Sequence, residues 1–358
     1  MPPPTTRTPI GLLVDLSAGQ TLYARNAEAR MIPASMTKAM SALVAFDLIK
    51  AGKLRESDMV TVRPQTAARW AGKGTSLNLR AGEQVSVHDL LRGLNTVSAN
   101  DAAVVLAEAA LGSEAAWTRA MNRRAQELGM NASHFATSNG WPDGGKTYVT
   151  ARDMVRPAQA LIVEHPELYR RYIGRKSFAW RGAVLTSHDP LAEILPGADG
   201  IKTGFTSQAG YTFLGAVQRE GRRLILVIGR APSESARALA ATELAEWGYA
   251  RWDSRPFLDR SWIVGAARVQ DGAVRQVPLS VARPFALTVP KGTKPPVAGR
   301  IIYSGPLRAP IGKGTVVAGL QVHMQGQPDH FLPLVATRDV ARAGPIDRLR
   351  NGLLGLLE

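Results

Sequence analysis

The sequence changes character near residue 252, and this change limits the folds that the chain can adopt. Before it, segments with apolar residues at helical spacing alternate with short β-rich runs. After it, prolines recur, helical periodicity disappears, and short β-branched runs such as 286–289 and 315–320 alternate with Gly and Pro turns. The pattern predicts an α/β domain over residues 1–252 and a small all-β domain over residues 253–342.

Strands are predicted near both ends of the first domain. Residues 10–15 and 20–24 flank a turn-forming Ser-Ala-Gly cluster, and residues 210–218 and 223–229 flank an Arg-Glu-Gly-Arg turn. Both pairs indicate hairpins. Because helical patterns fill the chain between them, we expect an antiparallel sheet built from distant segments and covered by helices.

Start signals mark the predicted helices. A helix is expected from Ser35 to Lys50, closed by Gly52, and another over residues 233–247. Capping boxes at residues 86–89 and 150–153 predict two further helix starts. These signals place the polar stretch around Thr96 to Asn100 in a loop between apolar helices.

Composition excludes several classes of function. The chain has 358 residues and no cysteine, which excludes disulfides, thiolate zinc sites and cysteine nucleophiles. Its net charge is +15, but Lys and Arg are scattered rather than gathered with interleaved aromatics, so no nucleic-acid partner is expected. The charge equally suits an anionic polymer or a membrane surface. The histidines form no HExxH pair, so no metal site or cofactor is expected.

Three polar clusters carry the candidate chemistry. Ser35 and Lys38 stand three residues apart at the start of a predicted helix, where an amine can reach a hydroxyl, although an N-cap serine with a solvated lysine has the same spacing. Ser98 and Asn100 follow, and taken alone they fit a cap for the next helix. The third cluster is Lys202-Thr203-Gly204, which taken alone fits an exposed turn.

In this order, SxxK, SxN and KTG resemble the penicillin-recognising serine enzymes, to which β-lactamases and penicillin-binding proteins belong. More narrowly, the chain resembles the low-molecular-weight D-alanyl-D-alanine carboxypeptidases. Segments 32–38, 74–77, 98–102, 150–154 and 199–204 carry the likeness, which extends over the β-rich domain and the C-terminal tail. The resemblance implies an α/β, β-lactamase-like fold with a second all-β domain.

The resemblance also implies a role for each site residue. Ser35 would be the nucleophile and Lys38 its base, neutral because burial and nearby Lys202 lower its pKa. Ser98 would relay a proton to the leaving amine, and Asn100 would hold Lys38 and the substrate amide. The amides of Ser35 and Phe205, which follows Gly204, would form the oxyanion hole, and Thr203 and Arg237 would bind the terminal carboxylate.

Two segments depart from the family pattern or imitate another one. Residues 187–189, Ser-His-Asp, stand where the family often has Asn-Arg-Asn, and Phe205 replaces a polar residue found in some relatives. Residues 140–147 fit the phosphate-loop pattern GxxxxGK[ST], but no buried strand precedes them and the next helix cap is Thr150. We expect a Gly-rich surface loop beside the active site instead of a nucleotide site.

The predicted function is a serine DD-carboxypeptidase that removes the terminal D-alanine from peptidoglycan stem pentapeptides through a Ser35 acyl-enzyme and is acylated by β-lactams. A DD-endopeptidase acting on crosslinks would share this chemistry. A β-lactamase is disfavoured because no ExxLN element follows the second motif. A binding protein of another class would hold anionic wall polymer through its net charge with the motifs inert.

The C-terminal tail, residues 343–358, carries an apolar stripe beside Arg348 and Arg350. It is too short to span a bilayer, so we expect an amphipathic helix that contacts a membrane surface or docks on protein. Residues 1–9 contain no apolar core of a signal peptide, so an export signal is absent from this sequence. The resemblance implies a periplasmic or extracytoplasmic enzyme at the periphery of the inner membrane.

Overall fold

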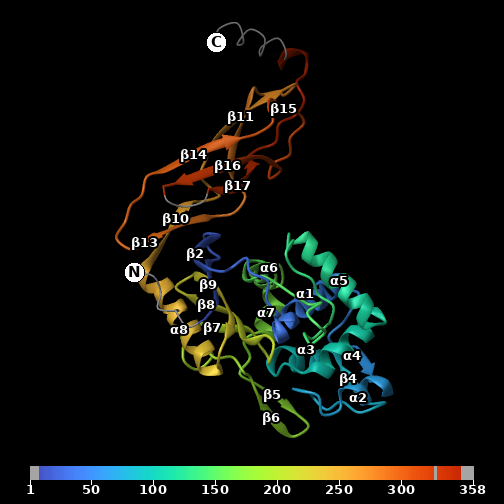
Figure 1. The fold of residues 1–358 in the computed structure, drawn as a ribbon. Coiled ribbons are helices and arrows are strands. Elements are labelled where there is room, and N and C mark those ends of the chain that lie inside the picture. Colours follow the sequence, from blue (N-terminus) through green and yellow to red (C-terminus); the bar gives the residue numbers. More distant parts are fainter. Residues whose placement is uncertain (1–7, 326–328, 348–358) are drawn as a thin grey trace. The chain divides into compact units, whose positions relative to one another are not determined.

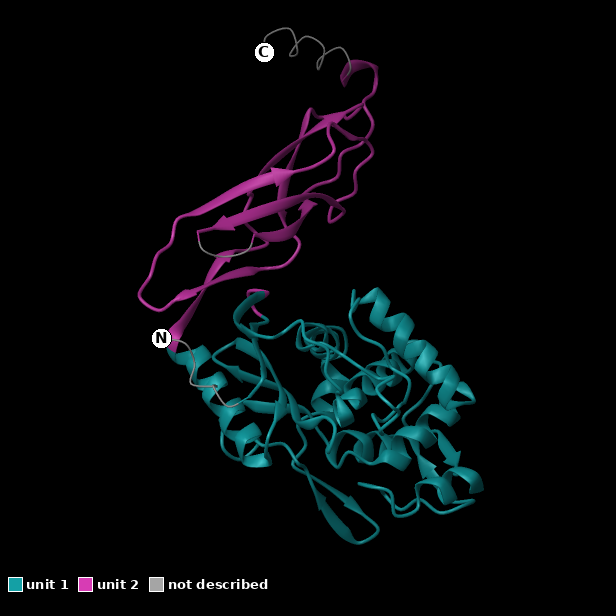
Figure 2. Cartoon of the chain, in the orientation of Figure 1, with its two compact units in different colours: residues 1–16, 20–250 teal, residues 17–19, 251–358 magenta. Residues whose placement is uncertain are grey.

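The chain contains two compact units, seen in a computed structural model that describes residues 8–325 and 329–347. The first unit comprises Met1–Leu16 and Gln20–Ala250, and the second comprises Ser17–Gly19 and Arg251–Glu358 (Figure 2). Each unit has a hydrophobic core of its own. The two units are described separately below.

A five-stranded antiparallel sheet forms the centre of the first unit, with strand order β2-β1-β9-β8-β7 (Figure 1). The strands are β1 (Ile10–Asp15), β2 (Gln20–Arg25), β7 (Ala198–Thr206), β8 (Gly210–Arg219) and β9 (Arg222–Ala231). Strands from the two ends of the unit are therefore neighbours, since β1 pairs with β9. The predicted antiparallel sheet built from distant segments is confirmed.

Helices cover both faces of this sheet. Helices α1 (Thr37–Lys50) and α6 (Ala151–Glu164) contact one face. Helix α8 (Glu234–Arg251) packs on the other, where a Cβ at Gly248 would lie 2.7 Å from Leu13. Side chains that alternate along β1 serve the two faces, as the period of a strand requires. The remaining elements of the unit are η1 (Ala34–Met36), β3 (Met59–Thr61), α2 (Pro64–Trp70), β4 (Gln84–Ser86), α3 (Val87–Thr96), α4 (Asn100–Leu111), α5 (Glu114–Glu127), α7 (Pro166–Tyr172), β5 (Ser177–Trp180) and β6 (Ala183–Thr186).

Most local signals in the sequence match this structure. Both hairpins form, and the turn between β8 and β9 is Glu220-Gly221, whose positive φ angles of 48° and 78° suit a two-residue hairpin loop. Both predicted helix starts are confirmed with their N-cap bonds: Ser86 Oγ accepts from the amide of Asp89, and Thr150 Oγ1 accepts from that of Asp153.

The first helix starts close to Ser35, as predicted, with a 3₁₀ turn ahead of the α-helix. Ser35 lies in the 3₁₀ turn η1, and α1 begins at Thr37. Ala34, at the start of this turn, has a φ of 50°, which an α-helix does not accommodate. The last helix of the unit differs from its prediction, since α8 begins at Glu234 and continues to Arg251.

The second unit is built from strands. A sheet of order β14-β16-β17-β12-β11-β15 and a two-stranded ribbon of β10 and β13 surround a core that includes Val277, Leu279, Val322 and Leu334. The predicted runs 286–289 and 315–320 fall in β13 and β16. The strands are β10 (Trp252–Leu258), β11 (Gly265–Gln270), β12 (Gln276–Val281), β13 (Phe285–Pro290), β14 (Val297–Ile302), β15 (Leu307–Arg308), β16 (Val316–Met324) and β17 (His330–Ala336).

The predicted tail helix lies largely outside the described residues, which end at Asp347. The tail therefore stays a prediction. Within the described part of the chain, no helix combines the length and apolar character needed to cross a membrane.

The separate cores predict that damage to one unit will spare the other. Leu334 is fully buried in the second core, so Leu334→Ala should destabilise that unit by about 2–5 kcal/mol. Every candidate site residue lies in the first unit, so its reactivity should not change. Thermal unfolding would measure the loss of stability. Acylation by a fluorescent penicillin would measure the reactivity of the site, at a temperature about 20 °C below the first unfolding transition, which for a typical mesophilic domain lies at about 45 °C or above. A fall in acylation rate there would contradict the independence of the units.

Candidate active site

The candidate residues meet at a cavity of about 410 Å³ in the first unit. Seven of the nine predicted site residues line it, and the other two are buried and bonded to its lining. Lys38 Nζ lies 2.8 Å from Ser35 Oγ, and Lys202 Nζ donates to the carbonyl of Thr203 at 3.1 Å. The seven lining residues are Ser35, Ser98, Asn100, Thr203, Gly204, Phe205 and Arg237.

Ser35 is held by a strained turn backed by a glycine. Ala34, immediately before it, has a φ of 50°, a conformation that is uncommon for a residue with a side chain. Gly140 lies against this turn so closely that a Cβ there would come within 1.8 Å of the Ala34 carbonyl oxygen. The Gly-rich loop therefore helps to fix the position of Ser35.

Lys38 is completely buried, and its amine has three neighbours within hydrogen-bond distance. Nζ donates to Asn100 Oδ1 at 2.8 Å and to the Asn139 carbonyl at 2.9 Å, and it lies 2.8 Å from Ser35 Oγ. Two of these partners can only accept. A neutral amine that donates both its protons to them turns its lone pair towards the Ser35 hydroxyl. The geometry therefore suits a base that receives the Ser35 proton.

Electrostatics favours that neutral form. Burial lowers the pKa of Lys38 well below its ordinary value, the positive charge of Lys202 lowers it further, and Asp101 acts in the opposite direction. Burial also lowers the pKa of Lys202 to about 7, with the charge of Arg237 adding to the effect and Asp189 opposing it. The charge of Arg237 thus disfavours the protonated form of Lys202, and the charge of Lys202 disfavours that of Lys38.

Ser98 does not cap the following helix. The residue at the cap position of α4 is Ala99, and no side chain caps it. Ser98 has a φ of 64°, and its buried Oγ has no hydrogen-bond partner among the described residues. Ser98 is a lining residue of the cavity, but its hydroxyl lacks the bond to Lys38 or Lys202 that a closed proton network would have. The interpretation of Ser98 and Asn100 as a cap is therefore wrong.

Strand β7 brings Lys202-Thr203-Gly204 against Ser35. A Cβ at Gly204 would lie 2.5 Å from Thr212 Oγ1, 2.6 Å from the Pro33 carbonyl and 3.0 Å from the Ser35 amide nitrogen. Glycine is needed there because the strand and the turn touch. Phe205 is 53% exposed, and its ring lies 4.2 Å from that of Tyr211, which gives this side of the cavity an aromatic surface.

Arg237 reaches the cavity from the first turns of α8. Its side chain is buried, and Nη2 donates to Glu234 Oε1 at 2.7 Å. His188 lines the same cavity, and burial followed by the charge of Lys202 lowers its pKa. The segment that departs from the family pattern therefore contributes to the cavity wall.

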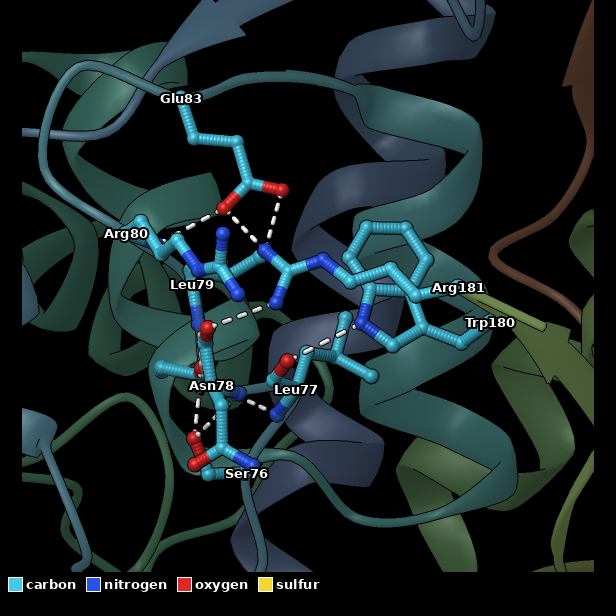
Figure 3. A network of polar contacts seen from close by, with 9 residues as sticks. Ser76, Leu77, Asn78, Leu79, Arg80, Glu83, Trp180 and Arg181 are labelled. Carbon is cyan, nitrogen blue, oxygen red and sulfur yellow. Dashed lines mark hydrogen bonds and ion pairs between the residues drawn. The ribbon is translucent and has the colours of Figure 1, made fainter. Parts of the chain in front are cut away.

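A polar network anchors the segment of residues 74–79, which lines the cavity through Gly74 and Thr75 (Figure 3). Buried Asp101 accepts from Ser76 Oγ and from the amides of Leu77 and Leu79 at 2.6 to 3.0 Å. From the β5–β6 hairpin, Trp180 Nε1 donates to the Leu77 carbonyl at 3.0 Å, and Arg181 donates to Asn78 and Glu83. The Asn100 amide also donates to the Thr75 carbonyl, so this segment is held both by α4 and by the β5–β6 hairpin.

Sequence reasoning missed several residues of this site. The Asn139 carbonyl binds Lys38 through the main chain, which no side-chain motif reveals. Trp141 lines the cavity from the Gly-rich loop, and this loop is followed by a helix only at Ala151. The prediction of a Gly-rich loop beside the site, and not of a phosphate loop, is confirmed. Glu234 and Tyr211 had no signal beyond their positions near Arg237 and Phe205.

One acidic cluster lies away from the cavity. Asp47, Glu164 and His165 bring their ligand atoms within 4.8 Å of one another. Arg124 forms ion pairs with both carboxylates, and His165 Nε2 lies 2.8 Å from Asp47 Oδ1. The arginine already supplies the positive charge that a metal ion would bring, so the cluster is a salt-bridge network.

Comparison with known proteins identifies the family. The D-alanyl-D-alanine carboxypeptidase family, peptidase S11, matches residues 2–233, and the C-terminal domain of penicillin-binding protein 5 matches residues 252–342. The chain belongs to the D-alanyl-D-alanine carboxypeptidases. It is a serine-type carboxypeptidase with the penicillin-recognising fold and a second all-β domain, as the sequence predicted.

Relatives of this carboxypeptidase span its whole length. The D-alanyl-D-alanine carboxypeptidase DacA of Haemophilus influenzae is 32% identical over 355 residues, 98% of this chain and 90% of the relative. The crystal structure of penicillin-binding protein 5 from the same organism matches with a TM-score of 0.84 at 31% identity, covering 96% of this chain and 100% of that one. Penicillin-binding protein D2 of Listeria monocytogenes, solved in an ampicillin-bound form, matches 69% of this chain and 100% of its own with a TM-score of 0.62 at 29% identity.

The contact between β7 and the nucleophile turn can be tested at Gly204. Gly204→Ala should separate the strand from Ser35 and reduce the acylation rate on the order of 100-fold, because small displacements of reacting groups have effects of that size. Stopped-flow acylation by a chromogenic β-lactam measures it. Gly299→Ala is a matched control in a β-strand, where the new Cβ meets only Leu320 at 3.5 Å. An unaltered rate in Gly204→Ala would show that this close contact is unimportant.

Proposed function

We propose that Ser35 is the nucleophile of this carboxypeptidase and that Lys38 is its general base. The observation that supports this most strongly is the arrangement around Lys38 Nζ. Two acceptors, Asn100 Oδ1 and the Asn139 carbonyl, use two of its protons, and the third position faces Ser35 Oγ at 2.8 Å. Burial and the charge of Lys202 lower the pKa of Lys38, which favours the neutral form that a general base requires.

In acylation, Ser35 Oγ attacks the carbonyl carbon between the two terminal D-alanines of a peptidoglycan stem pentapeptide. Its proton passes to Lys38, the C–N bond breaks, and the amine of the departing D-alanine receives a proton through Ser98. Ser98 belongs to the cavity lining, and its buried hydroxyl forms no hydrogen bond with any described residue, which leaves it free to take part in that relay. Water then attacks the ester carbonyl, so Ser35 regains its proton and the shortened peptide leaves with a new carboxylate.

The cavity also supplies groups for the two oxygen-rich parts of the substrate. The amides of Ser35 and Phe205 would stabilise the oxyanion, which is consistent with the close approach of β7 to η1 at Gly204. Thr203 and Arg237 would bind the terminal carboxylate, because both line the cavity and Arg237 is a buried cation. Asn100 would hold Lys38 on one side and meet the substrate amide on the other.

β-Lactams act on such an enzyme as substrates that acylate it, and the ampicillin-bound form of the Listeria relative supports this for the fold. Peptidoglycan lies outside the cytoplasmic membrane, so we place the working enzyme in the periplasm or an equivalent compartment. We also propose that residues 343–358 contact the membrane surface peripherally, since their sequence combines an apolar stripe with Arg348 and Arg350.

The proposed function predicts release of D-alanine by a Ser35-dependent reaction. The wild-type enzyme should release D-alanine from a stem pentapeptide, and mass spectrometry after penicillin treatment should map the adduct to the peptide containing Ser35. Ser35→Ala should abolish both reactions, and Lys38→Ala should slow acylation by roughly three or more orders of magnitude while the protein stays folded.

A crosslinked dimer in the same assay separates the alternatives. Faster cleavage of the crosslink than of the pentapeptide would favour an endopeptidase. Acylation that persists in Ser35→Ala would refute the nucleophile assignment, and salt-sensitive binding of wall polymer without D-alanine release would favour a non-catalytic binding protein.

The coupling between the two lysines predicts a shift in the pH profile. Acylation requires neutral Lys38, so its rate should rise with pH through the pKa of Lys38 and then level off. The charge of Lys202 lowers this pKa, so Lys202→Met should raise it and move the acidic limb to higher pH, whatever the maximal rate becomes. The exposed Lys53→Met is the control and should leave the limb in place. If the acidic limb of the pH–rate profile of Lys202→Met is unchanged or shifts to lower pH, the assignment of Lys38 as the base is contradicted.

A further inference from the structure

Arg237 and Glu234 form an unequal ion pair at the cavity wall. The two residues are three positions apart in the first turn of α8, and both line the cavity that contains Ser35 and Thr203. The Arg237 side chain is 4% exposed, whereas the Glu234 side chain is 66% exposed. A buried cation is thus paired with a carboxylate that stands largely in solvent.

The pairing leaves part of the guanidinium unused. Nη2 donates to Glu234 Oε1 at 2.7 Å, but the buried Nε of Arg237 has no hydrogen-bond partner within the described residues. A guanidinium can bind one carboxylate through two parallel N–H donors, which is stronger and more directional than a single bond. Glu234 therefore satisfies Arg237 only partly.

The other charged and aromatic groups near Arg237 do not complete its coordination. The ring of Tyr211 lies with its centroid 5.7 Å from the guanidinium carbon, and the cation Lys202 adds positive charge nearby. Asp189 is half-buried, burial raises the pKa of its carboxyl, and no hydrogen bond joins it to Arg237 among the described residues. Burial lowers the pKa of Arg237 itself, with Glu234 as the largest opposing influence. An incoming carboxylate would meet a desolvated cation with a free donor.

We infer that Glu234 is a specificity-determining residue, which occupies Arg237 in the free enzyme and yields it to the free carboxylate at the end of the substrate peptide. This inference rests on the carboxylate-binding role given to Arg237 in the proposed function. The exchange is feasible because the 66% exposed Glu234 side chain is readily hydrated on release, and because the substrate carboxylate takes its place, so the buried Arg237 is not left unpaired. The substrate carboxylate gains the second donor that Glu234 leaves unused, but it must first displace Glu234, whereas a peptide that ends in an uncharged group does not compete for Arg237 and leaves the pair intact. Glu234 therefore reduces the preference of the cavity for peptides that end in a carboxylate.

The test is Glu234→Gln, which keeps the shape of the side chain and removes its charge. Two blocked tripeptides ending in D-Ala-D-Ala are compared, one with a free carboxylate and one with a C-terminal amide. For the carboxylate peptide, kcat/KM should rise about threefold through a lower KM with kcat unchanged, because the competing anion is gone. For the amide, kcat/KM should not change. Glu243→Gln removes a charge further along the same helix and should leave both values at the wild-type level.

A companion variant separates failure of this inference from failure of the proposed function. Arg237→Met should bring kcat/KM for the carboxylate peptide down towards that for the amide. If it affects both peptides equally, the carboxylate-binding role of Arg237 fails, and the inference about Glu234 fails with it. If Arg237→Met behaves as expected but Glu234→Gln leaves kcat/KM unchanged, lowers it, or raises it equally for both peptides, only the role of Glu234 is overturned.

Discussion

The burial of one amine next to one hydroxyl is the constraint on which the rest of this structure depends. Lys38 has no exposed surface, and an ammonium group in that position would be unfavourable beside Lys202. The surrounding structure offers just enough acceptors for a neutral amine: Asn100 Oδ1 and the Asn139 carbonyl. The third hydrogen-bonding position of the amine faces Ser35 Oγ, so the base is already in contact with the nucleophile before substrate binds.

Three separate parts of the chain, one of them the contiguous η1 and α1, have to meet for that arrangement to exist. The turn η1 supplies Ser35, α1 supplies Lys38, the start of α4 supplies Asn100, and the Gly-rich loop supplies the Asn139 carbonyl. Two glycines allow the meeting, since a side chain at Gly140 or Gly204 would overlap the backbone around Ser35. The strain at Ala34 and Ser98 is carried by the same small region. Close backbone packing is therefore what makes the short motifs work together.

The difference between local signals and contacts between distant segments explains what the sequence could and could not predict. Hairpins and helix caps were predictable because they depend on neighbouring residues, as at Ser86 and Thr150. The residues of SxxK, SxN and KTG could be named because their order resembles a family. The positive φ of Ala34 and its close contact with Gly140 could not be predicted, because Gly140 lies more than 100 residues further along the chain. Asn139 could not be found because it acts through its main-chain carbonyl group. The pairing of Glu234 with Arg237 could not be linked to the site because only the folded structure shows that both residues line the cavity.

Strand β7 is the terminal strand of its sheet and pairs with β8 on one side only. Such a strand presents main-chain N–H and C=O groups along its other side, and an extended peptide can align with them as an additional strand. Recognition of this kind would use main-chain groups, so substitutions along β7 other than by proline would change the surroundings of a bound peptide without removing those groups. Inhibitors that rely on the backbone of β7 would for this reason be harder to escape by point mutation than inhibitors that rely on Phe205 or His188.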